Sequence, residues 1–418
     1  MRTDRAFKTS PGYRRVNRPA RKSYLDFNYA VGDGIELLNP LHWDLVTAGQ
    51  SLFLQRAFCK LMESDGPRAV KHRYGIVYRQ NDPVAVVAAR IAPLRDSMPP
   101  VDVRIPRRPL TFRTPPAIPT SVDEIERPAP SLRLMICGDF YAGGFHGLAI
   151  RAGEDLGRLW PAIGSLLNRI QLQEQLSRDR DYILIKDVPA MPAADTRLLR
   201  QQQYRRFDTS PNMVLELSPR WSAYEDYLAQ LNVRYRLVAH RAARELYRQG
   251  YETGTLDHLA PWAQRIHELY GMVQRKSGLS YAELPKDFLP ALAEQLGPAH
   301  LRCSALFQGD SMAGFVVVVK DRDDAICHSI GWDTAAGASA PLLPSLLHTA
   351  IRDSLDLGCR RVNFGRTALR LKAQLGAHPD QSELWIQHAR PELGLSVSTI
   401  LETLSHAPAG DVASPLPI

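Results

Sequence analysis

Cysteine is scarce in this 418-residue sequence, and the cysteines that occur are not grouped. There are five of them, an odd number, and none forms a C-x-x-C pair. Disulfide-rich secreted domains and structural zinc sites rely on grouped cysteines, so the spacing argues against both classes. We expect reduced, buried thiols and no bound metal. The five residues are Cys59, Cys137, Cys303, Cys327 and Cys359.

Long hydrophobic runs are also missing. No run approaches the roughly 18 apolar residues of a membrane-spanning helix. Residues 1–30 contain several basic residues but lack the apolar core of a secretory signal. We therefore expect a cytoplasmic protein without stable membrane insertion, in which residues 1–30 form a disordered basic arm.

Acidic residues are fewer than basic ones. The sequence has 44 Asp and Glu against 52 Lys and Arg, which gives a formal net charge of +8. Such an excess favours anionic partners, for example a phosphorylated cofactor, nucleic acid or an acidic membrane surface. An arginine-rich surface without a particular ligand would give the same composition, so the charge alone leaves both interpretations open.

Two sets of helices and strands follow one another along the chain, as judged from the spacing of apolar residues. The first set is a helical region at 38–61, strands at 74–78 and 84–91, a proline-rich exposed loop at 96–130, a strand at 132–137, a helix at 156–176 and a strand at 182–186. The second is a strand at 213–217, a helix at 221–247, a helical region at 261–296 broken near 277–285, strands at 301–307, 313–320 and 325–331, a helix at 342–357 and strands at 361–364 and 384–388.

The similar order of the two sets indicates a duplicated α+β architecture, because a meander of antiparallel strands feeds a helix and then a further strand in each. We expect one domain at 31–205, which includes the loop at 96–130, and a second at 206–404. Residues 405–418 would form a flexible tail.

The end of the strand at 325–331 and the loop after it form the first candidate site. A small-residue loop there leads into a helix N-terminus, where backbone N–H groups favour an anion. The loop has neither the G-x-x-x-x-G-K-[ST] nor the G-x-G-x-x-G pattern. A flexible surface turn explains the same residues.

Arginine and lysine cluster where the next strand gives way to a helix. Arg366, Arg370 and Lys372 fall in the stretch RRVNFGRTALRLKAQLGA, which spans 360–377. A guanidinium and an ammonium there would hold a phosphate or a carboxylate. Solvation of an exposed helix face is the alternative, and it suits Arg370 best.

Four segments resemble the GNAT-related acyltransferases, and among these the Fem-like proteins. They are LMICGDFYAGGFHGLAI at 134–150, MVLELSPRWSAYEDYLAQLNVRYR at 213–236, HSIGWD at 328–333 and PLLPSLLHTAIRDSLDLGCRRVNFGRTALRLKAQLGA at 341–377. The resemblance covers most of residues 40–390 and is specific in the last third of the chain. It implies tandem GNAT-like domains with mixed, mostly antiparallel sheets flanked by helices.

The resemblance also implies transfer of an acyl group to an amine on a small molecule or a peptide. The donor would be acyl-CoA, with acetyl-CoA the first choice, or an aminoacyl-tRNA, which would make tRNA a partner. The sequence departs from the usual GNAT phosphate loop, since no R/Q-x-x-G-x-G/A lies between Ile330 and Leu342. A binding protein without catalysis on the same fold is a further alternative.

Such a reaction needs a base for the amine and donors for the oxyanion. His328 and Asp333 are the candidate catalytic residues, provided that the strand bends near Gly331 to bring them to one face. A core histidine and a turn aspartate are the plain alternatives. Arg366 and Lys372, with Asn363 and Gly365, would hold the donor.

Two other stretches allow both a functional and a structural interpretation. The glycine-rich segment 138–147 would form a second small-molecule site with His146, or only a tight turn that requires glycine. The arginines of 234–244 would bind tRNA or CoA, or form a solvated helix face with pairs such as Arg241–Glu245.

Overall fold

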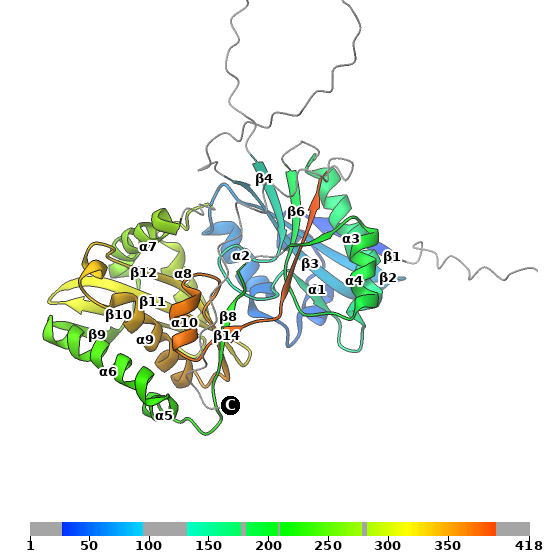
Figure 1. Cartoon of the computed structure of the whole chain (residues 1–418). Helices are drawn as coiled ribbons and strands as arrows, with labels where there is room; N and C mark the ends of the chain where they lie inside the picture. Colours follow the sequence, from blue (N-terminus) through cyan, green and yellow to red (C-terminus); the bar gives the residue numbers. More distant parts are fainter. Residues whose placement is uncertain (1–26, 95–131, 177–180, 208–209, 278–281, 390–418) are drawn as a thin grey trace, which may run out of the picture.

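The computed structural model describes residues 27–94, 132–176, 181–207, 210–277 and 282–389, and two sheets with flanking helices build this part of the chain (Figure 1). The strands of the first sheet lie in the order β1 (Phe27–Gly32), β2 (Lys71–Arg79), β3 (Asp82–Leu94), β4 (Leu132–Cys137), β6 (Asp181–Val188), β15 (Glu383–His388) and β7 (Arg205–Phe207), and β5 (Leu148–Ile150) pairs with β3. Those of the second lie in the order β14 (His378–Pro379), β8 (Met213–Glu216), β13 (Arg361–Asn363), β12 (Asp324–Trp332), β11 (Ser311–Asp321), β10 (Leu301–Gln308) and β9 (Tyr251–Thr255).

Helices cover the faces of these sheets (Figure 1). They are α1 (Pro40–Thr47), α2 (Arg56–Ser64), α3 (Leu156–Gln173), α4 (Ala193–Gln201), α5 (Tyr224–Gln230), α6 (Val233–Arg248), α7 (Ala263–Ser277), α8 (Phe288–Leu296), α9 (Leu342–Asp356) and α10 (Leu369–Gln374). Each sheet contains one parallel pair, β4 with β6 and β12 with β13, and its other pairs are antiparallel. The predicted α+β class with two mixed, mostly antiparallel sheets is therefore confirmed.

One strand is exchanged between the halves: β15, which follows the second half in the chain, belongs to the first sheet. After β6 the chain forms α4 and β7 and then contributes β8 to the second sheet, where β8 pairs with β13. After β13 the chain forms α10 and β14 and then contributes β15 to the first sheet, where β15 pairs with β6. The strand expected at 384–388 is thus present, but it lies outside the second domain to which the sequence assigned it.

Some predicted elements differ from those observed. The helix expected at 221–247 is two helices, because Asn232 interrupts it and its side chain accepts a hydrogen bond from the backbone N–H of Arg234 at the start of α6. The helical region expected at 38–61 is α1 and α2 with a 3-10 turn between them. The loop at 96–130, the arm at 1–30 up to Asp26 and the tail at 405–418 lie outside the described residues.

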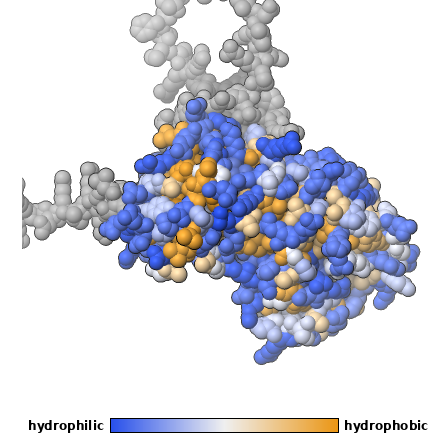
Figure 2. Space-filling model, turned by 180° about the vertical axis from the view of Figure 1, so that it is seen from behind, coloured by the Kyte–Doolittle hydropathy of each residue, from blue (hydrophilic) through white to orange (hydrophobic). Residues whose placement is uncertain are grey.

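An apolar cluster joins the two halves. Phe53 and Phe58 of the first half pack in it with Leu259, Phe288 and Phe315 of the second. On the rear of the molecule, hydrophobic residues gather in a vertical band on the first half and are more scattered on the second (Figure 2). The buried contact fixes the halves against each other, and this positions the cavity described next.

Candidate functional site

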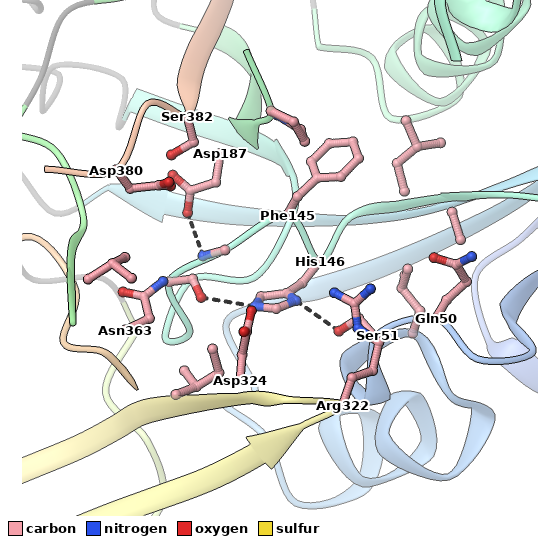
Figure 3. Close-up of a pocket in the computed structure, with 18 of the residues that line it drawn as sticks. Gln50, Ser51, Phe145, His146, Asp187, Arg322, Asp324, Asn363, Asp380 and Ser382 are labelled. Atoms are coloured by element: carbon pink, nitrogen blue, oxygen red, sulfur yellow. Dashed lines mark hydrogen bonds between the residues drawn. The ribbon is translucent and has the colours of Figure 1, made fainter. Parts of the chain in front are cut away.

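A cavity of about 370 Å³ lies between the two halves (Figure 3). The first half contributes Ser51, the loop 143–146 and Asp187 to its wall, and the second half contributes Arg322, Asp324, Arg361 and Asn363. The connection from β14 to β15 contributes the segment 380–382. Its size is in the range of small-molecule sites, and so is its position between domains.

Strand geometry explains why these segments meet. The parallel strands β4 and β6 end side by side, so the loop after Cys137 and the residues around Asp187 leave the same edge of the first sheet. In the second sheet Asn363 pairs with Val214 on one side and with Ile326 on the other. Cross-strand partners share a face of a sheet, and these three residues form the floor of the cavity.

His146 is buried in the cavity wall and is held at both ring nitrogens. Its Nε2 lies 2.9 Å from the carbonyl oxygen of Gly143, and its Nδ1 lies 2.8 Å from the hydroxyl of Ser51. Since a carbonyl only accepts, Nε2 donates and Nδ1 accepts from Ser51. Burial lowers the pKa of His146, even though Asp321 nearby acts in the opposite direction. The ring is therefore a neutral, fixed part of the wall.

The turn before His146 requires glycine. Gly144 has φ of +125°, and a Cβ on it would lie 2.5 Å from Nε2 of His146. The segment 138–147 thus contains a turn that needs glycine, and its histidine lines the cavity.

Asp187 forms a buried ion pair beside the cavity. Its carboxylate accepts hydrogen bonds from the backbone N–H of Gly144 at 2.7 Å and from the guanidinium of Arg366, and Nζ of Lys186 lies 3.2 Å away. Burial alone would raise the pKa of Asp187, but the two cations and the N–H group lower it to about 2. Arg366 also donates to the carbonyl of Ser210 at 2.5 Å.

Arg366 therefore binds an anion of the protein itself rather than one of a ligand. Lys372 is similarly engaged, because only 3% of it is exposed and its Nζ donates to the carbonyls of Phe364 at 2.6 Å and Gly365 at 3.2 Å. Burial lowers the pKa of Lys372 to about 8. Both cations have a different role from the anion-binding one expected from the sequence: they fix the chain after β13.

Asn363 and Gly365 lie where that chain meets the cavity. Asn363 lines the cavity, and its side-chain oxygen accepts from the backbone N–H of Gly365 at 2.9 Å. Gly365 has φ of +73°, in the region that favours glycine. This bond assigns the amide orientation of Asn363, so that its Nδ2 group is the donor.

His328 and Asp333 are not brought together by the structure. A bulge in β12 leaves His328 without a cross-strand partner, since Cys327 pairs with Val318 and Ser329 with Val317. The imidazole lies in the apolar cluster between Phe53 and Phe288, with ring centroids 6.3 and 6.2 Å away, and burial lowers its pKa to about 4.

Asp333 has the contacts of a turn residue. Its carboxylate accepts from the backbone N–H groups of Ala335 at 3.0 Å and Ala336 at 3.1 Å, and Arg265 lies 3.8 Å away. His328 and Asp333 were expected to share a face through a bend near Gly331. The irregularity in β12 lies at His328 itself instead, and the histidine side chain is buried in the core.

Besides Asp187, four charged residues of the cavity were missed by sequence reasoning. Arg361 pairs with Asp324 through two hydrogen bonds of 3.0 and 2.6 Å. Arg322 lies in the turn between β11 and β12, and Asp380 follows β14. The residues come from three separate segments, and none has a motif that would have distinguished it from a surface charge.

Metal binding has no visible basis in the part of the chain that the structure describes. No group of three or more His, Cys, Asp or Glu side chains there is arranged to hold a metal ion. All five cysteines are free thiols, and four of them are buried.

Comparison with protein families identifies a domain in the second half. Residues 232–373 match the model of the acetyltransferase (GNAT) domain. The second half therefore contains a GNAT acyltransferase domain. A search of curated proteins finds no match.

Solved structures are similar to most of the chain, beyond the GNAT domain itself. FemX is 10% identical, with a TM-score of 0.50 over 86% of this chain and 98% of FemX. A tandem GNAT protein from the clavulanic acid biosynthesis pathway, in a structure without AcCoA, is 12% identical, with a TM-score of 0.47 over 87% of this chain and 98% of that one. At such identities the likeness concerns the fold alone, which is similar to that of FemX.

The GNAT domain makes this protein an acyltransferase. Among the helices that the structure describes, none has the length and apolar character needed to cross a bilayer. The donor and the acceptor are inferred below from the residues that line the cavity.

Proposed function

We propose that this GNAT protein transfers an acyl group from acyl-CoA, with acetyl-CoA the first choice, to an amine bound in the cavity between the halves. The observation that carries the proposal is the cavity itself: it lies on the face of β8, β13 and β12 of the second sheet, and carboxylates and an amide converge in it. The acyl carbonyl would reach Asn363 from the second half.

The chemistry needs a proton acceptor, and Asp380 supplies it in this proposal. Its carboxylate lines the cavity and makes no ion pair with the described residues. An amine attacks only as its neutral form, so the proton passes to a nearby base, directly or through water. His328 is too deeply buried to receive it, and Asp333 is held in its turn.

Asn363 supplies the hydrogen bond to the oxyanion. Its Oδ1 is occupied by the N–H of Gly365, which leaves the Nδ2 group to donate. Donors fixed before the reaction stabilise a developing negative charge. Arg366 and Lys372 act as positioning residues, because they hold the carbonyls and the carboxylate around this segment.

The test measures release of the CoA thiol from acetyl-CoA in the presence of a panel of amines. We expect Asp380→Asn and Asn363→Ala each to lower kcat about 100-fold or more. Asp323→Asn is the matched control, since Asp323 is exposed and does not line the cavity. Calorimetric titration with coenzyme A reports donor binding separately. Donor binding without turnover of any amine would favour the non-catalytic binding protein.

Helix α6 favours a second candidate, an aminoacyl-tRNA donor. It exposes Arg234, Arg241 and Arg244 to solvent, and clustered exposed arginines suit a phosphate backbone. Binding of charged tRNA should then weaken steeply with salt, and the double variant Arg241→Ala/Arg244→Ala should flatten that dependence. Absence of coenzyme A binding together with this salt dependence would replace the acyl-CoA proposal.

A further inference from the structure

Three Asp and Arg residues that line the cavity lie in ion pairs, and two others do not. Asp187 is neutralised by Arg366, and Asp324 by Arg361. Arg322 and Asp380 make no direct ion pair with any residue that the structure describes, although Asp380 is near enough to Arg361 for its charge to raise the pKa of that guanidinium. The cavity thus offers one cation and one anion to a ligand.

These two charges lie on opposite sides of the cavity. Figure 3 shows Asp380 beside Asp187 and Ser382, and Arg322 across the cavity beside Ser51 and Gln50. Arg322 is held in the turn between β11 and β12 with φ of 58°, so its position at the rim is set by the backbone.

Further polar groups gather at the Asp380 side. The hydroxyl of Ser382 and the side-chain amide of Asn212 are buried, and neither has a hydrogen-bond partner among the described residues. The backbone carbonyl of Asn212 accepts from the N–H of Asp380 at 2.8 Å, and its side-chain oxygen lies 2.9 Å from where a Cβ on Gly143 would be. Buried polar groups in native proteins are usually hydrogen-bonded. Of these two residues only Ser382 lines the cavity, so its hydroxyl is the group that a ligand can reach.

An ammonium group matches this side of the cavity. It carries three donors and no acceptor, and the cavity residues Asp380 and Ser382 can supply a carboxylate and a hydroxyl. A guanidinium such as that of Arg322 prefers a carboxylate or a phosphate, which it can grip with two hydrogen bonds.

We propose that the acceptor is a zwitterion of the size of an amino acid or short peptide, with its amine at Asp380 and Ser382 and its carboxylate at Arg322. The inference rests on the proposed N-acyltransferase function and specifies its substrate class. A volume of about 370 Å³ suits a molecule of this size.

The reaction balances without a further reactant. The ammonium first gives one proton to Asp380, which passes it to water, and the neutral amine nitrogen bonds to the thioester carbonyl carbon. The carbon–sulfur bond then breaks, and the second proton of the nitrogen passes to the leaving thiolate, so that coenzyme A leaves as the thiol. The amide product has lost the positive charge but keeps the carboxylate. Its attraction to Asp380 is therefore lost, which favours product release.

The experiment compares L-lysine with cadaverine, which has the same two amines but no carboxylate, as acceptors for acetyl-CoA. We expect kcat/KM to be at least about tenfold higher for L-lysine, as for a charge-assisted hydrogen bond. Arg322→Ala should raise the KM of L-lysine about tenfold more than that of cadaverine, and Arg322→Lys should restore part of the difference. Arg200→Ala is the control, since Arg200 is exposed on α4 outside the cavity.

The other outcomes separate the two proposals. Equal use of L-lysine and cadaverine, with equal effects of Arg322→Ala, would overturn the zwitterion while N-acyl transfer stands. A preference for phosphoethanolamine over L-lysine would show that the anionic group is a phosphate and would overturn the carboxylate. If no amine is acylated, equilibrium dialysis decides: binding of L-lysine that Arg322→Ala weakens supports the zwitterion site, and absence of binding overturns it.

Discussion

The Asp187–Arg366 ion pair joins the two halves of the molecule next to the cavity. Asp187 belongs to the end of β6 and Arg366 follows β13, and the carboxylate is fully buried. A buried charge that loses its partner is expensive, because the remaining charge stays out of water without compensation.

Replacing Arg366 should therefore destabilise the protein strongly. We expect Arg366→Ala to lower the free energy of unfolding by about 3–5 kcal/mol, measured by urea unfolding. The double variant Asp187→Asn/Arg366→Ala should recover part of this loss. Arg370→Ala is the control, since Arg370 is exposed and its loss should change stability by no more than about 0.5 kcal/mol. If Arg366→Ala lowers the free energy of unfolding no more than Arg370→Ala does, the ion pair does not stabilise the protein.

Lys372 makes stability depend on pH in the alkaline range. Its pKa is lowered from 10.5 to about 8, so between these values the unfolded chain binds a proton that the folded chain has released. The free energy of unfolding should accordingly rise with pH from about 8 to 10.5 through this group.

Urea unfolding at several pH values, compared between the wild type and Lys372→Met, isolates this contribution. The difference between the two proteins should grow over the window in favour of the wild type. Lys286→Met, at an exposed position, should show no such pH dependence relative to the wild type. A parallel pair of curves for wild type and Lys372→Met would contradict the lowered pKa.

At the scale of elements, the break between α5 and α6 depends on one side chain. Asn232 has extended backbone geometry, and its side-chain oxygen satisfies an N–H at the start of α6 that has no partner within the helix. The apolar spacing continues through this residue, which is why the sequence predicted a single helix.

Asn232→Ala should lower the free energy of unfolding by about 1 kcal/mol through loss of the cap. Amide hydrogen exchange in the first turn of α6 should also become faster. Asn232→Asp serves as the matched variant, because aspartate caps a helix about as well as asparagine. An alanine variant as stable and as protected as the aspartate variant would show that the cap contributes nothing.

At the scale of the whole molecule, the exchange of β15 couples the two halves. β15 comes from the end of the chain but pairs with β6 and β7 of the first sheet, and Trp385 within it is fully buried in the core of the first half. Loss of β15 therefore opens the first half, and loss of β8 opens the second.

Trp385→Ala should lower the free energy of unfolding by about 3–5 kcal/mol, as for a large buried aromatic side chain. Hydrogen exchange followed by mass spectrometry should show both sheets losing protection in one transition. Trp262→Ala, at a partly buried position outside the exchanged strands, should cost less. Two separate transitions in the wild type would show that the halves unfold independently despite the exchange.

Much of the fold was predictable from the sequence because it depends on local pattern. The hairpin of β2 and β3 and the run of β10, β11 and β12 follow from apolar spacing and short turns. Short strands such as β5 and β7 were missed, because three residues are too few for a periodic pattern.

The candidate site was predictable only in part. Asn363 and His146 were singled out by their neighbourhoods and do line the cavity, whereas Arg322 and Asp380 have no local feature that distinguishes them. Arg366 and Lys372 were conspicuous as charges, but the sequence could not show that their partners lie inside the protein.

The sequence by itself determined the α+β class, the order of most elements and the GNAT character of the second half, since these depend on periodicity and on motifs that are contiguous in the chain. Only the tertiary structure decided the strand exchange, the cavity and the pairing of its charges. Asp187 and Arg366 are 179 residues apart, and β15 meets β6 across nearly the whole second half. Contacts of this kind depend on how the sheets pack, and no local pattern encodes them.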